Sequence, residues 1–182
     1  MRLDALLQRE GALAPAEVLV VAQELLTTLR ALHAGGRVHR AVQPANVFVE
    51  RGGESTRVRL DDAGTARAPN RGADAGAFAY SAPEQVRGAS QVDARADLYA
   101  VGALVFHALT GRLPFEAANA LTRIALKLDR DAPTLASVTE RAWPPAIERF
   151  VATSLRRERS ERYASADAAL ADLGSWSDLG IP

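Results

Sequence analysis

Apolar residues recur at helical spacing along most of this chain. Between residues 15 and 34 they fall every three or four positions, which places them on one face of a helix. Gly35-Gly36 follows, and a glycine pair of this kind ends a helix in a left-handed conformation. Residues 93–109 are apolar on most sides, so we expect a buried helix there, closed by Gly111.

Shorter apolar patterns complete the outline of the fold. Residues 47–49 and 58–60 predict two strands, and Gly52-Gly53 between them predicts a hairpin. Residues 65–80 predict a loop. Further helices are expected at 2–9, 117–128, 145–155 and 164–173. The sequence therefore predicts a mainly α fold of about six to seven helices with one small β-hairpin, in a single domain over residues 1–182.

Composition narrows the classes of function. The formal net charge is zero and the pI is about 6.9, so no electrostatic argument favours nucleic acid or an anionic membrane. There is no cysteine, which excludes disulfides and thiolate metal sites. No apolar run approaches the roughly 20 residues that span a bilayer. We expect a cytoplasmic protein without nucleic-acid or membrane partners.

The stretch from His39 to Asn46 carries the candidate chemistry. It reads His-Arg-Ala-Val-Gln-Pro-Ala-Asn and resembles the catalytic loop H-R-D-L-K-P-x-N of bacterial, eukaryotic-type serine/threonine protein kinases. In that family the Asp accepts the proton of the substrate hydroxyl, the Lys steadies the phosphoryl group and the Asn holds magnesium. The resemblance implies that Ala41 and Gln43 replace the Asp and the Lys, while Arg40 is kept.

Two further motifs imply a degenerate activation segment over residues 62–84. Asp62-Ala63-Gly64 resembles the D-F-G motif, with Ala63 in place of the Phe. Ala82-Pro83-Glu84 resembles the A-P-E motif that closes the segment. Ala77 stands where the family carries its activation Thr, so we expect no phosphorylation switch at this point.

Several matching residues are expected to have structural roles. Asp97 and Gly102 match the D-x-Y-S-x-G start of the family's large buried helix, and that Asp accepts hydrogen bonds from the backbone of the catalytic loop. The resemblance implies that Arg162 pairs with Glu84 and that His39 lies hydrogen-bonded in the core. Within the charged run 156–162 we therefore expect only Arg162 to be buried.

The resemblance covers only the family's C-terminal lobe. The 182 residues contain no glycine-rich G-x-G-x-x-G loop and no V-A-I-K lysine, and the chain is expected to begin where the family's hinge ends. We therefore expect the N-terminal lobe to be absent. Asn46 and Asp62 are the vestigial candidates for a nucleotide and magnesium site, but two ligands without substrate phosphates make a weak one. No cofactor is expected, and nucleotide binding should be absent or very weak.

These observations predict a catalytically inactive pseudokinase that binds another protein, or a second copy of itself, as a scaffold or regulator. The expected contact face is the one left by the missing lobe, around Leu3, Leu6, Leu7 and Phe48. One alternative is the lower half of a split kinase, which would bind Mg-ATP only with an N-terminal lobe supplied by another chain. A second alternative is a vestigial fold without a partner.

Other residues that could carry chemistry are expected to have no catalytic or binding role. Trp143 and Trp176 are expected to pack in the core and not to stack on bases. Asp61-Asp62 could suggest a pair of catalytic carboxylates, but adjacent residues of a strand point to opposite faces. No G-x-S-x-G motif is present, so a hydrolase has no sequence support.

Overall fold

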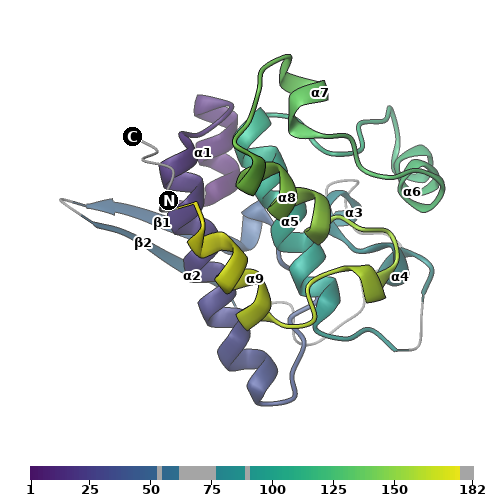
Figure 1. Ribbon diagram of the computed structural model, residues 1–182, viewed down its shortest axis with the longest axis horizontal. Coiled ribbons are helices and arrows are strands. Elements are labelled where there is room, and N and C mark those ends of the chain that lie inside the picture. Colours follow the sequence, from purple (N-terminus) through teal and green to yellow (C-terminus); the bar gives the residue numbers. More distant parts are fainter. Residues whose placement is uncertain (53–54, 62–76, 89–90, 177–182) are drawn as a thin grey trace.

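The fold is mostly helical, with one antiparallel pair of strands (Figure 1). Figure 1 shows the computed structural model, which describes residues 1–52, 55–61, 77–88 and 91–176. Its elements are α1 (Leu3–Glu10), α2 (Pro15–Ala34), the 3₁₀ turn η1 (Pro44–Asn46), β1 (Val47–Gly52), β2 (Ser55–Leu60), α3 (Ala77–Tyr80), α4 (Pro83–Val86), α5 (Arg95–Thr110), α6 (Ala120–Asp129), α7 (Leu135–Thr139), α8 (Pro145–Ser154), η3 (Arg159–Glu161) and α9 (Ala166–Gly174).

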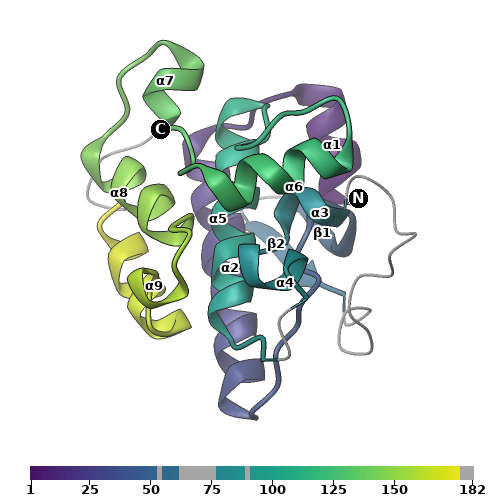
Figure 2. The same cartoon turned by 90° about the vertical axis from the view of Figure 1, so that its right-hand side faces the viewer.

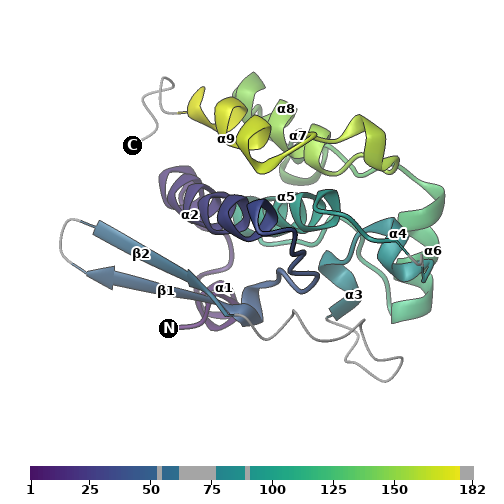
Figure 3. The same cartoon turned by 90° about the horizontal axis from the view of Figure 1, so that it is seen from below.

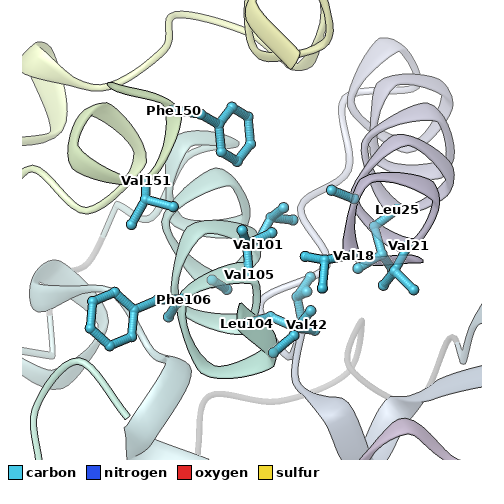
Figure 4. Close-up of a cluster of buried hydrophobic side chains, with 14 of the residues drawn as sticks. Val18, Val21, Leu25, Val42, Val101, Leu104, Val105, Phe106, Phe150 and Val151 are labelled. Atoms are coloured by element: carbon cyan, nitrogen blue, oxygen red, sulfur yellow. The ribbon is translucent and has the colours of Figure 1, made fainter. Parts of the chain in front are cut away.

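Helix α5 forms the centre of the molecule. Its residues from Ala96 to Phe106 are all buried, as expected of a helix that is apolar on most sides. It ends at Gly111, whose left-handed φ of 68° a residue with a side chain would adopt at a cost. Figure 4 shows side chains of α5 meeting those of α2 and α8 in one apolar cluster that includes Val18, Val21, Leu25, Val101, Leu104, Val105, Phe150 and Val151.

The helices and the hairpin form layers around α5. Figure 3 shows α2 beside α5 in a middle layer, with α8 and α9 on one side and the hairpin and α1 on the other. Helix α2 contacts α5, α9 and β2, so it connects the three layers. The stretch from His39 to Asn46 follows α2 and leads into β1. This stretch therefore lies between the middle layer and the hairpin.

A close contact fixes α5 against α8. A Cβ atom placed on Gly102 would lie 2.3 Å from the Cβ atom of Ser154, far inside van der Waals contact. Any larger residue at position 102 would therefore push the two helices apart. The predicted structural role of Gly102 is explained by this approach of the two helices.

The predicted hairpin is confirmed. Val47 pairs with Leu60 and Phe48 with Arg59, in antiparallel register. At its far end Arg51 donates two hydrogen bonds to Glu10 and two to Glu17, at 2.7–2.8 Å, and so connects the hairpin to α1 and α2.

The longer predicted helices are confirmed with boundaries within about three residues, whereas short ones were missed. Helix α7, five residues long, and the four-residue α3 and α4 were not predicted. The described residues therefore contain nine α-helices and not six to seven. Helices of one turn cannot show the i, i+3, i+4, i+7 pattern on which the prediction rested. Residues 77–80, expected as loop, form α3.

The leucines of α1 are not on an open face. Leu3 and Leu6 are fully buried and Leu7 is 6% exposed, so the expectation that they line a partner-binding surface is wrong. Their helix packs on η1 and β1, and this contact covers the apolar side of α1 within the chain itself. Phe48, the fourth residue of that expected surface, is half-buried.

Both tryptophans are packing residues, as predicted. Trp176 is fully buried and meets the ring of Phe150 edge-on, with ring centroids 5.5 Å apart. Trp143 is 8% exposed, and its Nε1 donates to the Thr139 hydroxyl. None of the helices in the described part of the chain has the length and apolar character needed to cross a bilayer.

Candidate functional site

Asp97 holds the loop that resembles the kinase catalytic loop. It lies in the first turn of α5, is 1% exposed, and accepts hydrogen bonds from the backbone N–H groups of His39 at 2.8 Å and Arg40 at 2.7 Å. The ring of His33, in the last turn of α2, lies 2.8 Å from the same carboxylate through Nε2. A carboxylate can only accept, so His33 Nε2 carries the proton. The predicted role of Asp97 is confirmed.

His39 is the buried support of the loop, as expected. Its side chain is in the core at 2% exposure, and Nε2 lies 2.8 Å from the carbonyl oxygen of Asp61. The N–H of Ala41 points at Nδ1 at 3.3 Å. A carbonyl accepts and an N–H donates, so both contacts are satisfied by a neutral imidazole protonated on Nε2. His39 therefore positions the backbone and is unsuited to bind a metal.

Arg40 has a strained backbone. Its φ is 66°, in the left-handed region that residues with a side chain rarely adopt. Its N–H is held by Asp97, and its carbonyl oxygen accepts a hydrogen bond from Gln85 Nε2 at 3.0 Å. The side chain is exposed. The strained conformation is thus maintained by contacts on both sides of the residue.

Position 41 lacks a group that could accept a proton, although the loop around it is intact. Asn46 Nδ2 donates to the carbonyl oxygen of Ala41 at 2.8 Å, and the N–H of Asp61 donates to the carbonyl oxygen of Asn46 at 2.8 Å. With its amide nitrogen engaged, Asn46 could offer a metal only its amide oxygen. Gln43 brings an uncharged amide where the related family has a lysine.

Part of the expected site lies outside the described residues. The part left out comprises Asp62, Ala63 and most of the segment 62–84, together with the side chain of Ala77. The Asn46–Asp62 pair and the Asp61–Asp62 geometry therefore stay predictions. Among the residues that the structure does describe, no three His, Asp or Glu side chains are grouped so that they could hold a metal ion.

Glu84 and Arg162 form the predicted ion pair. The Arg162 side chain is fully buried, Glu84 is 12% exposed, and the two groups make a bidentate contact at 2.8 and 2.9 Å. The guanidinium lies 4.9 Å from the ring centroid of Tyr99. The remaining three N–H bonds of Arg162 go to the backbone carbonyls of Arg95, Arg156 and Arg157. All five donors of the guanidinium are satisfied.

A second buried cation was not predicted. Lys127 is the chain's only lysine, and its side chain is 1% exposed. Its Nζ donates to the carbonyl oxygens of Phe78, Ala79 and Ser81 at 2.7, 3.1 and 2.6 Å. The sequence pattern predicted a helix over residues 117–128 but gave no role to this lysine. The isolation of one lysine in an arginine-rich chain was the available signal.

The surroundings of Lys127 act on its protonation in two directions. Burial lowers the pKa of Lys127 to about 7, and the neighbouring Arg123 and Arg162 add to that effect. The three carbonyl oxygens favour the protonated form, because an ammonium group has three N–H donors for three acceptors.

A cleft of about 420 Å³ opens beside the loop. Its walls come from α1, η1, α3 and α5, and they include Gln43, Tyr80 and His107. The Tyr80 hydroxyl and His107 Nδ1 share a hydrogen bond of 2.7 Å, and burial raises the pKa of Tyr80 and lowers that of His107. Both side chains are therefore neutral at pH 7, so these two residues give the cleft polar groups without net charge.

A loop held by a buried aspartate at the start of a central helix, together with a buried Glu–Arg pair, defines the C-terminal lobe of the protein-kinase fold. The comparisons agree with this assignment. Residues 1–172 match the protein kinase domain family, and the chain belongs to that family.

Curated relatives are bacterial serine/threonine-protein kinases. PknL of Mycobacterium tuberculosis is 38% identical over 187 residues, covering 99% of this chain and 46% of that protein. PksC of Streptomyces coelicolor is 37% identical over 91% of this chain and 30% of its own length. A Myxococcus xanthus kinase, pkn3, is 34% identical over 94% of this chain and 33% of its own length. The chain thus spans less than half the length of these relatives.

Proposed function

We propose that this chain is a catalytically inactive kinase lobe, a pseudokinase, that acts by binding another protein as a scaffold or regulator. One observation carries the proposal. The contacts that shape the loop are complete at Asp97, His39 and Asn46, yet the loop presents a methyl group at position 41 and an amide at position 43. A cytoplasmic location, with no nucleic-acid or membrane partner, is part of this proposal.

The replaced residues supply the chemistry of phosphoryl transfer in the family. Without a carboxylate at position 41 nothing in the loop accepts the proton of a substrate hydroxyl, and without a lysine at position 43 the transferred phosphoryl group loses a positive charge. The structural contacts, in contrast, include a buried ion pair and a strained backbone. Loss of the chemistry with retention of the shape supports a role in binding.

The first test measures phosphoryl transfer. Three proteins are assayed for turnover of radiolabelled ATP: the wild-type chain, the double variant Ala41→Asp/Gln43→Lys, and a control. The control is the double variant with Asp62→Asn added. We expect no turnover by any of them, because the 182 residues contain no glycine-rich loop to hold the phosphates. Turnover by the double variant above the control would overturn this expectation.

The proposed partner surface is the face of the loop and the hairpin that the N-terminal lobe covers in a two-lobed kinase. With the leucines of α1 buried, the apolar residue left from the sequence expectation is Phe48, whose ring lies under the guanidinium of Arg59 at 4.8 Å. The partner would be another protein or a second copy of this chain. Light scattering on the purified chain measures self-association, and affinity capture from extract measures binding of other proteins.

A pair of substitutions tests the position of this surface. Phe48→Arg adds a charge to the proposed surface, and Leu121→Arg adds the same charge to α6, where Leu121 is 79% exposed. We expect the first variant to lose its partner and the second to keep it. Because Phe48 is half-buried and its ring lies under Arg59, Phe48→Arg should also lower the melting temperature, so binding is compared where both variants are folded. Equal binding by both variants would contradict the assignment of this face.

The split-kinase alternative has one observation in its favour. Asn46 is retained, and its side chain is held at the end of the loop by Ala41. Under this alternative an N-terminal lobe from another chain would complete a nucleotide site with Asn46 and Asp62. Calorimetry with Mg-ATP distinguishes the two functions, since micromolar affinity for the purified chain would favour the split kinase.

A further inference from the structure

Helix α6 is attached to the rest of the molecule in an unusual way. Its only buried residue is a lysine, Lys127, while Leu121 is exposed and Ile124, Leu126 and Leu128 are half-buried. Its main packing partners are the short helices α3 and α4 (Figure 2). A buried polar contact therefore holds α6 where an amphipathic helix would normally use its apolar face.

The Lys127 contact joins two segments that are far apart in sequence. Phe78, Ala79 and Ser81 belong to α3 and the residue that follows it, and their carbonyl oxygens converge on Lys127 Nζ. The carbonyl groups in the last turn of a helix have no N–H partner within that helix. When they are buried, they therefore need a hydrogen-bond donor from elsewhere in the protein. Lys127 supplies it, and the removal of its ammonium group would take away the donor that these three carbonyl oxygens share.

The charged and aromatic groups around the contact come from α4, from α5, from α6 itself and from the residue after η3. Tyr99 of α5 has its ring centroid 5.4 Å from Lys127 Nζ. Arg123 of α6, Arg162 and Glu84 also act electrostatically on the lysine, and the two arginines oppose its positive charge. The three carbonyl oxygens, the Tyr99 ring and the negative charge of Glu84 are therefore what favours a cation at this position.

The segment that Lys127 holds is also a wall of the cleft. Tyr80 lies between the residues whose carbonyls Lys127 binds, and its side chain points to His107 in the cleft wall. A displacement of α6 would release the backbone on both sides of Tyr80. The Lys127 side chain therefore links the position of α6 to the shape of the cleft.

We propose that Lys127 is a latch that couples α6 to the Tyr80 wall of the cleft, so that α6 can be released as a unit while the rest of the lobe stays folded. A protein that draws α6 outward would thereby loosen the cleft, and an occupant of the cleft would hold α6 in place. This coupling does not depend on whether the chain transfers phosphate.

The first experiment compares two variants that each remove one positive charge from the region of α6. Lys127→Met removes the latch, whereas Arg130→Met changes a residue that is 71% exposed just beyond the helix. Hydrogen exchange is then measured over residues 77–86 and, as an internal reference, over α8. We expect exchange in 77–86 to be at least about tenfold faster in Lys127→Met alone, with α8 unchanged. Unchanged exchange in 77–86, or equal acceleration in α8, would overturn the proposal.

The second experiment uses the wild-type protein and decides the matter if Lys127→Met fails to fold. Because the chain has a single lysine, acetylation by an N-hydroxysuccinimide ester at that position reports its exposure. Labelling is followed by mass spectrometry at rising urea, while the fluorescence of the buried Trp143 and Trp176 follows global unfolding. We expect Lys127 to react at urea concentrations below the fluorescence transition. Labelling that coincides with that transition would show that α6 is not released separately.

Discussion

Two arginines of this protein bind carboxylates in much the same way and differ in their surroundings. Arg162 makes a bidentate contact with Glu84, and Arg51 makes bidentate contacts with both Glu10 and Glu17. The Arg162 side chain is fully buried, whereas that of Arg51 is 40% exposed. Counted by hydrogen bonds to carboxylates, Arg51 would be the stronger anchor. Burial reverses this order, because water can readily replace the partners of Arg51 and has little access to those of Arg162.

The largest expected effect is that of Arg162→Ala. Removing the guanidinium leaves the Glu84 carboxylate and three backbone carbonyls without this donor, in a largely buried place. Breaking a buried pair in this way costs about 3–5 kcal/mol, which lowers the melting temperature by about 6–20 °C in a domain of this size. Calorimetry measures it, and a change of only a degree or two would mean that the pair contributes little.

Arg162→Lys separates charge from geometry. A lysine keeps the positive charge but has three donors on one atom, so it cannot reproduce the five bonds of the planar guanidinium. We expect a loss of about 1–3 kcal/mol, between wild type and Arg162→Ala. A variant as stable as wild type would show that charge alone holds Glu84.

Arg51→Ala should have a much smaller effect, although it removes four hydrogen bonds to carboxylates. We expect the melting temperature to fall by no more than about 4 °C, because exposed ion pairs contribute little. At about 1 M salt the difference from wild type should shrink further, while that of Arg162→Ala should persist. A loss comparable to that of Arg162→Ala would contradict the comparison.

The smallest effect is a dependence on pH at the Arg51 cluster. Hydrogen bonds from Arg51, and then from Arg9, lower the pKa of Glu10 from 4.5 to about 2. A carboxyl group with a lowered pKa in the folded state contributes stability that is present above pH 4.5 and lost as the pH falls towards 2. The advantage of wild type over Glu10→Gln in melting temperature should decline across that window. An advantage that is constant with pH would exclude this source of stability.

The parts of the fold that sequence alone could predict are those with long periodic patterns. Helix α2 was expected between Pro15 and Gly35, and it spans Pro15–Ala34. The hairpin followed from two short apolar runs around a glycine pair. Helices α3, α4 and α7 have at most five residues, and their positions depend on contacts such as the bonds of Glu148 to the N–H groups of Leu135 and Ala136. A local pattern of apolar and polar residues cannot predict such contacts, because they join residues that are distant in sequence.

The site was predictable where a motif fixes a role and not where packing decides exposure. Asp97, His39, Glu84 and Arg162 were placed correctly, because the family pattern implies their partners. The leucines of α1 were placed on an open face, because their pattern shows an apolar side and does not show that η1 and β1 cover it. Lys127 was missed because a buried lysine is rare, and its three acceptors come from a segment about 50 residues away.

The contact between Gly102 and Ser154 has a mechanical consequence. With no room for even one added methyl group at Gly102, α5 and α8 resist sliding past each other, since a shift of one turn would bring a larger residue of the same face, Leu98 or Phe106, against Ser154. We therefore expect the two helices to move together. A partner that moves part of this lobe should do so away from the α5–α8 contact, for example in the hairpin, in α1 or in α6.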